Sequence, residues 1–187
     1  MKEADEYCAL EDCARNIFGR VRWSHKIQEK QADTYRCALH TMSIVSIVLS
    51  TIVSVGLISL LFTDKYILKL VSALVSCVST ILVAIIKEYD FGKMIQSHRE
   101  SAVKYLAVKD QLLLLIYRIR RKEEDCSLLE KELEVLVKKV NRINSSAPQT
   151  SDSAVRKASK ALKEKMDDTI SDMEIDNGLP WSLRKTR

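Results

Sequence analysis

The chain has 187 residues, with 30 lysines and arginines against 25 aspartates and glutamates, and a formal net charge of +5. This length is typical of one domain, or of one domain and a tail. The five cysteines are an odd number at wide spacings, which excludes a disulfide framework and a CxxC metal pair. With only four glycines and two prolines, little in the chain stops a helix, and the sequence predicts an all-α protein.

Residues 1–40 are charged and helix-prone, and we expect them to form an N-terminal cytoplasmic helix that leads into a membrane. About 38 charged and polar residues precede the first apolar run, and that run is longer than the core of a signal peptide, so we expect this segment to be retained. The helix has a weak apolar stripe, formed by Tyr7, Leu10, Ala14, Ile17, Phe18 and Val21.

Residues 41–86 predict a transmembrane hairpin. Its two spans, residues 42–62 and 66–86, are each about 21 residues long, which at about 1.5 Å per residue covers roughly 31 Å, close to the thickness of a hydrocarbon core. Lys69 lies about one turn inside the hairpin end, where its amine can snorkel to the headgroups. The alternative is a soluble bundle with a buried hairpin, but a soluble helix normally keeps a polar face, which these spans lack. We expect the turn between the spans, with Asp64 and Lys65, on the far side of the membrane.

Basic residues near the membrane predict the orientation of this hairpin. The tip has only Lys65 and Lys69, and both cytoplasmic flanks are richer in lysine and arginine, so both termini should be cytoplasmic. The flanking basic residues are Arg20, Arg22, Lys26, Lys30 and Arg36 before the hairpin, and Lys87, Lys93, Arg99 and Lys104 after it.

Each predicted span has a narrow stripe of small hydroxyl residues. The stripes are Ser43, Ser46, Ser50 and Ser54 in the first span, and Ser72, Ser76, Ser79 and Thr80 in the second. Small hydroxyl residues let membrane helices pack closely and bond across their interface. Alternatively, the stripes of several chains together line a water-filled pore, since two helices cannot enclose one.

Residues 87–144 predict one long cytoplasmic helix with a heptad seam, because apolar residues recur three and four positions apart. The seam consists of Tyr105, Val108, Leu112, Leu115, Ile119, Leu129, Leu133, Leu136, Val140 and Ile143. A helix this long cannot bury such a seam alone. It either pairs with copies of itself as a coiled coil, or folds back on the N-terminal helix. A second apolar face, formed by Leu106, Leu113, Leu114 and Ile116, could serve either contact.

Residues 145–187 predict a Ser-rich linker, a short amphipathic helix and a tail. The helix should be capped by Ser151, Asp152 or Ser153. Its apolar face should contain Ala154, Ala158, Leu162, Met166 and Ile170. Trp181 and Leu183 lie beside a basic end, and we interpret them as a docking contact for a partner or for the body of the protein, or as a loosely tucked side chain.

The sequence contains little that could support catalysis. There is no HExxH, GxSxG or P-loop motif, and His25, His40 and His98 stand alone. We therefore expect no enzyme activity, no catalytic residue, no cofactor and no metal. The basic run from Arg118 to Lys122 is followed at once by acidic residues, which favours a solvated helix face over direct nucleic-acid binding.

The segment WSHKIQEKQADTYRCALHTMSIVSIVLS joins a cytoplasmic helix directly to a Ser-rich membrane helix. With its Trp23, Ser24, His25 and Lys26 and the long helix after the hairpin, it resembles the SLATT proteins, which are two-helix membrane effectors associated with bacterial nucleotide-signalling and reverse-transcriptase defence loci. The resemblance covers residues 5 to 145 and does not extend to the tail.

The resemblance implies a pore-forming effector of antiviral defence in the bacterial inner membrane. On infection, such an effector oligomerises or opens, depolarises the membrane and stops growth before the phage matures, which is abortive infection. It further implies a homo-oligomer that is triggered by a neighbouring-gene sensor, a nucleotidyltransferase or a reverse transcriptase, or by a nucleotide signal. The sequence shows no recognisable nucleotide-binding domain, which favours a partner protein or the tail as the input over direct ligand sensing. The alternatives are a non-conducting membrane scaffold that clusters cytoplasmic partners through its coiled coil and, less naturally, a holin-like lysis protein.

Overall fold

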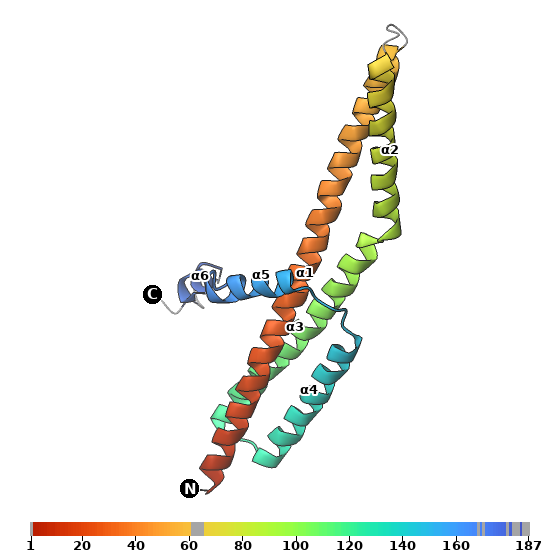
Figure 1. The fold of residues 1–187 in the computed structure, drawn as a ribbon. Coiled ribbons are helices and arrows are strands. Elements are labelled where there is room, and N and C mark those ends of the chain that lie inside the picture. Colours follow the sequence, from red (N-terminus) through yellow and green to blue (C-terminus); the bar gives the residue numbers. More distant parts are fainter. Residues whose placement is uncertain are drawn as a thin grey trace.

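The computed structural model describes residues 2–60, 66–167, 169, 171–178, 180 and 184. These residues form helices and no strand, which confirms the all-α prediction. The helices are α1 (Lys2–Leu60), α2 (Tyr66–Glu88), α3 (Phe91–Arg121), α4 (Cys126–Ser146), α5 (Asp152–Lys163) and α6 (Asp172–Gly178). An antiparallel hairpin of α1 and α2 extends away from a bundle in which α3 and α4 pack beside the N-terminal half of α1 (Figure 1). The predicted tip at Asp64 and Lys65 lies outside the described residues.

The first helix is continuous from the bundle into the hairpin. It has 59 residues, which corresponds to a rod of about 89 Å at 1.5 Å per residue. The segments expected as an N-terminal helix and as a first membrane span are thus one helix, without a break between them.

The hairpin has the length and surface of a membrane-spanning unit. Both α1 and α2 contain a stretch long and apolar enough to cross a bilayer. Their large apolar side chains point outward from the single chain: Ile47 is 66% exposed, Val55 59% and Ile67 75%. Apolar surface of this extent is unfavourable in water and is covered when lipid surrounds the hairpin. The protein is therefore a membrane protein.

The segment after the hairpin differs from the expected single helix over residues 87–144. It is interrupted at Tyr89–Asp90 and again at Lys122–Asp125. Asp90 adopts a left-handed conformation with φ of 38°, and its side chain caps α3 by accepting from the amide of Lys93. Lys122 is also left-handed, with φ of 54°, and Asp125 caps α4. The second interruption reverses the chain, so that α4 runs back along α3.

This reversal buries the heptad seam within one chain. All of the predicted seam residues from Tyr105 to Ile143 lie in a core formed by α1, α3 and α4. The N-terminal helix contributes the core residues Tyr7, Leu10, Ala14, Ile17 and Val21. Of the two arrangements considered for the seam, the structure adopts the one in which it packs on the N-terminal helix. In this conformation the seam has no exposed surface to offer a second copy as a parallel coiled coil.

The second apolar face of α3 is mostly uncovered. Leu113 and Leu114 are 55% and 65% exposed, and Tyr117 continues the same surface. Ile116 instead packs partly against the core. We call the surface formed by Val103, Leu106, Leu113, Leu114 and Tyr117 the outer face of α3.

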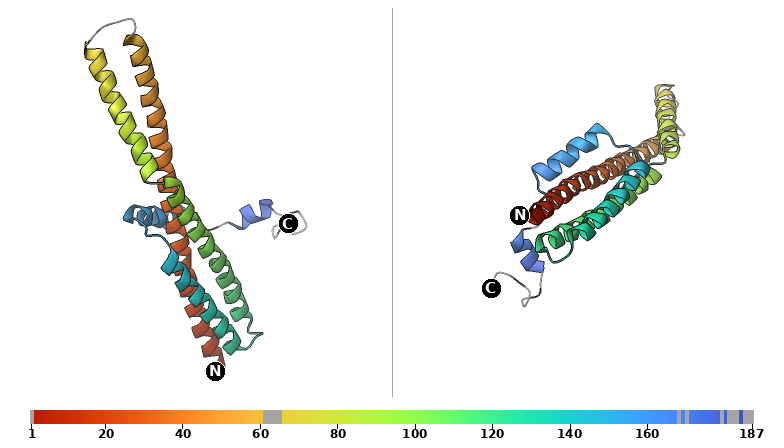
Figure 2. Two further views of the ribbon diagram at one scale, coloured as in Figure 1. Left: turned by 90° about the vertical axis from the view of Figure 1, so that its right-hand side faces the viewer. Right: turned by 90° about the horizontal axis from the view of Figure 1, so that it is seen from below.

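The short helix α5 docks on α1 from the side opposite to α3 and α4, as the end-on view in Figure 2 shows. Its N-cap is Ser151, one of the three residues that the sequence offered for this position. Its contact face consists of the buried residues Ala154, Ala158 and Ala161. The helix ends at Lys163, and Met166 beyond it is exposed.

Candidate functional site: hairpin interface and membrane-proximal junction

The two membrane helices approach closely where their residues are small. A Cβ atom on Gly56 would lie 2.6 Å from Oγ of Ser72, a distance that no ordinary contact allows. The hydroxyls of Ser50 and Ser79 face each other at 3.5 Å. Ser72 and Ser79 are buried between the helices although lipid would surround the rest of the hairpin. Within one chain, these residues pack the hairpin.

Other hydroxyls of the predicted stripes point outward and bond to their own helices. Ser54 donates to the carbonyl of Ser50, and Thr80 donates to the carbonyl of Ser76, each at 2.9 Å. Such back-bonding satisfies a hydroxyl that faces lipid. Ser43, Ser46 and Ser76 are half-buried at the edge of the interface. The eight predicted stripe residues therefore divide into an interfacial group and a lipid-facing group.

The residues of the family-like motif, Trp23 to Lys26, lie where α1 contacts both α3 and α5. His25 donates from Nδ1 to the carbonyl oxygen of Ala102 on α3, at 2.9 Å. The ring of Trp23 lies under the amine of Lys163, 5.8 Å from the ring centroid. Lys26 is buried and its amine lies 2.8 Å from Glu29 and 3.5 Å from Asp167. The motif thus fixes α1 against two other helices.

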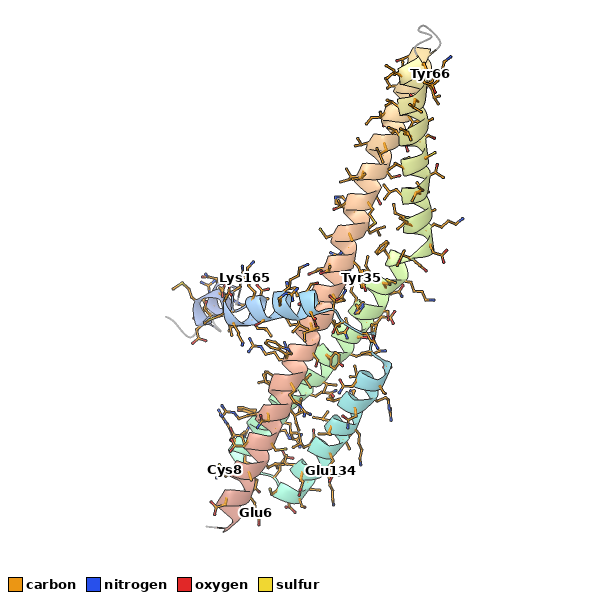
Figure 3. The ribbon with its side chains drawn as sticks, in the orientation of Figure 1. Glu6, Cys8, Tyr35, Tyr66, Glu134 and Lys165 are labelled. Atoms are coloured by element: carbon orange, nitrogen blue, oxygen red, sulfur yellow. The ribbon has the colours of Figure 1, made fainter. Side chains whose placement is uncertain are left out.

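A polar junction lies between this motif and the membrane hairpin. His98 of α3 is 3% exposed and donates from Nδ1 to Oε1 of Gln28, at 2.6 Å. The Gln28 amide donates in turn to the carbonyl of Pro148, at 3.2 Å. Tyr35 covers the histidine ring, with centroids 5.5 Å apart, and is labelled in Figure 3 close to the level of α5. Burial holds the pKa of His98 below the usual value for histidine, so its ring is neutral at pH 7.

A second glutamine attaches the segment that leads into α5. Oε1 of Gln31 accepts from the amide and the hydroxyl of Ser151, at 2.9 and 2.7 Å. One turn further along α1, Thr34 accepts from the amine of Lys157, at 2.9 Å. Asp167 then pairs with Lys30 at 3.7 Å. Polar side chains of one stretch of α1 therefore hold α3, α5 and the segment between α4 and α5 against α1.

Gln28 and Gln31 were not predicted as site residues, and His98 was interpreted only as an isolated polar member of a seam. One sequence signal was available: Gln28, Gln31 and Tyr35 recur three and four apart on α1, which places them on one face. Among the described residues, every buried side-chain nitrogen and oxygen has a hydrogen-bond partner. The junction is therefore a satisfied polar network, of the kind that specifies one packing arrangement.

The basic run at the far end of α3 is engaged in ion pairs. Arg118 donates to Glu124 and Glu132, each at 2.7 Å, and these hydrogen bonds raise its pKa further. Arg120 donates to Glu11 of α1, at 2.7 Å. These side chains also remain largely exposed, in agreement with the interpretation of the run as a solvated helix face. Within the part of the chain that the structure describes, no group of three or more His, Cys, Asp or Glu side chains could hold a metal ion. Trp181 and Leu183 lie outside that part.

A hairpin of two helices that can cross a membrane, continuous with a helical bundle, defines the class of two-helix membrane proteins. Residues 10–174 match the family model described as SMODS and SLOG-associating 2TM effector domain family 4, and the chain belongs to this SLATT family. The match extends past the expected limit at residue 145 and includes α5, which agrees with the docking of that helix on α1. No curated protein and no solved structure matches the chain.

Proposed function

We propose that the protein is a pore-forming effector of a bacterial antiphage defence system, whose copies assemble in the inner membrane and depolarise it. The main support is the distribution of polar groups in the hairpin. Small and hydroxyl residues such as Ser50, Gly56, Ser72 and Ser79 gather on the inner side, and large apolar residues cover the outer side. Two helices cannot enclose a conducting path, so the polar sides of several hairpins would have to face one another.

The proposed assembly places both termini and the whole bundle in the cytoplasm, as the basic flanks of the hairpin indicate. The outer face of α3 is the surface that we assign to contacts between copies in this assembly. It is apolar, exposed and outside the membrane-spanning stretch, so neither lipid nor the chain itself covers Leu113, Leu114 or Tyr117.

The proposed input is the product of a neighbouring gene, a nucleotidyltransferase or a reverse transcriptase that acts as the sensor. The family description associates these effectors with SMODS and SLOG domains. The polar junction supports a cytoplasmic input, because it joins α3 and the start of α5 to the part of α1 that leads into the membrane stretch.

The test is expression in a bacterium that carries a membrane-potential dye, with and without phage and the neighbouring gene. Replacing Ser46, Ser50 and Ser76 by leucine removes polar groups from the inner side and should abolish depolarisation at unchanged membrane abundance. The matched control replaces the outward, self-bonded Thr51 and Ser54 by leucine, and should depolarise normally. A wild-type protein that never depolarises the membrane under any of these conditions would refute the proposal.

A non-conducting scaffold is the second candidate, because Ser72 and Ser79 are buried in packing between the two helices, as they would be in a hairpin that never opens. A scaffold should protect cells against phage without any change in membrane potential. It should also tolerate the inner leucine substitutions as well as it tolerates the control substitutions.

A further inference from the structure

A cleft of about 740 Å³ lies between α1 and α4, on the part of the bundle farther from the membrane than the polar junction. None of the described residues that line it is acidic. They are Arg15, Asn16, Gly19, Arg20, Val21, Trp23, Ser24, Val140, Asn141 and Asn144. A neighbouring groove of about 810 Å³ between the same helices is apolar with a largely acidic rim, to which Glu6 and Glu134 contribute from opposite walls (Figure 3). The charged residues along α1 and α4 are thus mainly acidic around the 810 Å³ groove and basic around the 740 Å³ cleft. This difference indicates that the 740 Å³ cleft suits an anion.

The α1 wall of the cleft presents two rows of residues at helical spacing. Arg15, Gly19 and Trp23 form one row, and Asn16, Arg20 and Ser24 form the other. Within the described residues, Arg20 has no ion pair or hydrogen bond, and Arg15 has only a long contact with Glu11, at 3.4 Å. Both guanidinium groups are thus available, and their planar forks bind phosphate oxygens well.

The α4 wall adds two side-chain amides one turn apart. Oδ1 of Asn144 accepts from the hydroxyl of Tyr105, at 2.6 Å, which fixes that amide and leaves its NH₂ group as a donor. Asn141 has no hydrogen-bond partner among the described residues. Amides of this kind can both donate to and accept from the edge of a nucleobase.

Gly19 keeps the floor of the cleft open. Glycine in a helix interior is unfavourable relative to alanine, and it usually needs a reason such as a turn or a close contact. Gly19 has neither: a Cβ atom built on it would meet nothing within 4 Å. Its effect is to leave helix backbone uncovered on the floor of the cleft, between Arg15 and Trp23.

Trp23 supplies an aromatic surface at the end of the same row. Its ring is half-buried, and the amine of Lys163 of α5 lies over the ring, 5.8 Å from its centroid. A half-buried indole next to phosphate-binding side chains is a platform on which a base can stack.

We propose that this cleft binds a nucleotide. Its phosphates lie against Arg15 and Arg20, its sugar crosses the uncovered backbone at Gly19, and its base stacks on Trp23 within reach of the two asparagines. A peptide would find few apolar contacts here, because Val21 and Val140 are the aliphatic lining residues of the cleft. The site goes beyond pore formation, and binding can be measured on protein that conducts nothing.

The chain carries its own probe, because Trp23 and Trp181 are its two tryptophans. In full-length Trp181→Phe protein in detergent micelles, ATP, adenosine and inorganic phosphate are titrated with excitation at the red edge of the indole band. ATP should quench Trp23 fluorescence saturably. Adenosine lacks the phosphates that would contact the arginines, and inorganic phosphate lacks the base that would stack on Trp23. Each should therefore bind at least about tenfold more weakly than ATP.

Variants separate a binding role from a structural one. Arg20→Gln should weaken ATP binding about tenfold, whereas Arg156→Gln, which removes an exposed charge on α5, should leave it unchanged. Gly19→Leu should block ATP while leaving the helix intact. Gly19→Ala should raise the thermal unfolding midpoint and still weaken binding, which a purely structural glycine would not do.

Three results would overturn the proposal. The first is the absence of saturable quenching with any of the three probes. The second is equal affinity for ATP and inorganic phosphate, which would show that the base is not recognised. The third is far tighter binding of a short single-stranded RNA, which would make the cleft part of a nucleic-acid surface.

Discussion

Replacing Gln28 by leucine should destabilise the cytoplasmic bundle more than any surface substitution. Gln28 and His98 are 6% and 3% exposed, so the change leaves the Nδ1–H group of His98 buried without an acceptor. An unsatisfied buried donor costs about 1–3 kcal/mol, and the half-buried carbonyl of Pro148 loses its donor as well. We expect a loss of about 2–3 kcal/mol in the free energy of opening the bundle.

Native-state hydrogen exchange of the α3 amides in micelles measures this free energy. The loss corresponds to exchange that is faster by about 30- to 150-fold. The control is Gln96→Leu, which removes an exposed glutamine that bonds to Glu100 at 2.8 Å and should change the free energy by about 0.5 kcal/mol or less. In a double-mutant cycle, His98→Phe should restore part of the loss, because both polar partners are then gone. Equal effects of Gln28→Leu and Gln96→Leu would refute the assignment of a buried network.

Three further predictions concern the rest of the molecule. Burial lowers the pKa of His98 in the folded protein, so as the pH falls this histidine is protonated in the unfolded chain before it is protonated in the folded one. Bundle stability should therefore fall as the pH drops below 6.5. In His98→Phe protein, the stability measured by hydrogen exchange should depend less on pH over that range. Gly56→Leu should push α2 away from α1 at Ser72, which spin-label distances across the hairpin would detect. Leu112 and Leu133 both face the core within one chain, so Leu112→Asp with Leu133→Asp should open the bundle to protease. For the same reason, a single cysteine at position 133 in a cysteine-free chain should form no disulfide between two chains.

The helical class, the two spans and the core residues could be predicted from the sequence, because each depends on a periodic pattern of apolar side chains. The reversal at Lys122–Asp125 could not be predicted in the same way. No glycine or proline marks it, and Lys122 adopts a left-handed conformation that is unfavourable for lysine by about 1–2 kcal/mol. Burial of Leu112, Leu129 and their neighbours against α1 compensates for that strain, and this tertiary effect is not visible in local sequence.

The candidate site was predicted only in part for a similar reason. The serine stripes were visible as a spacing, but whether Ser50 faces Ser79 or lipid depends on how two helices rotate against each other. The junction joins Gln28 to Pro148, which lie 120 positions apart in the chain. Single-sequence patterns report neighbours within one helix, and they do not report which polar side chains meet across such a separation.

The two legs of the hairpin differ in stiffness where they leave the membrane. One leg continues as the unbroken α1, whereas the other ends at Glu88 and resumes in α3 after the left-handed Asp90. α1 can therefore move as one rigid rod, whereas the chain can bend between α2 and α3. A tilt of about 5° applied to the bundle would displace the far end of a helix of about 89 Å by roughly 8 Å. A rearrangement of the bundle would therefore be transmitted along α1 to its end at Leu60, whereas the break at Tyr89–Asp90 separates α2 from α3.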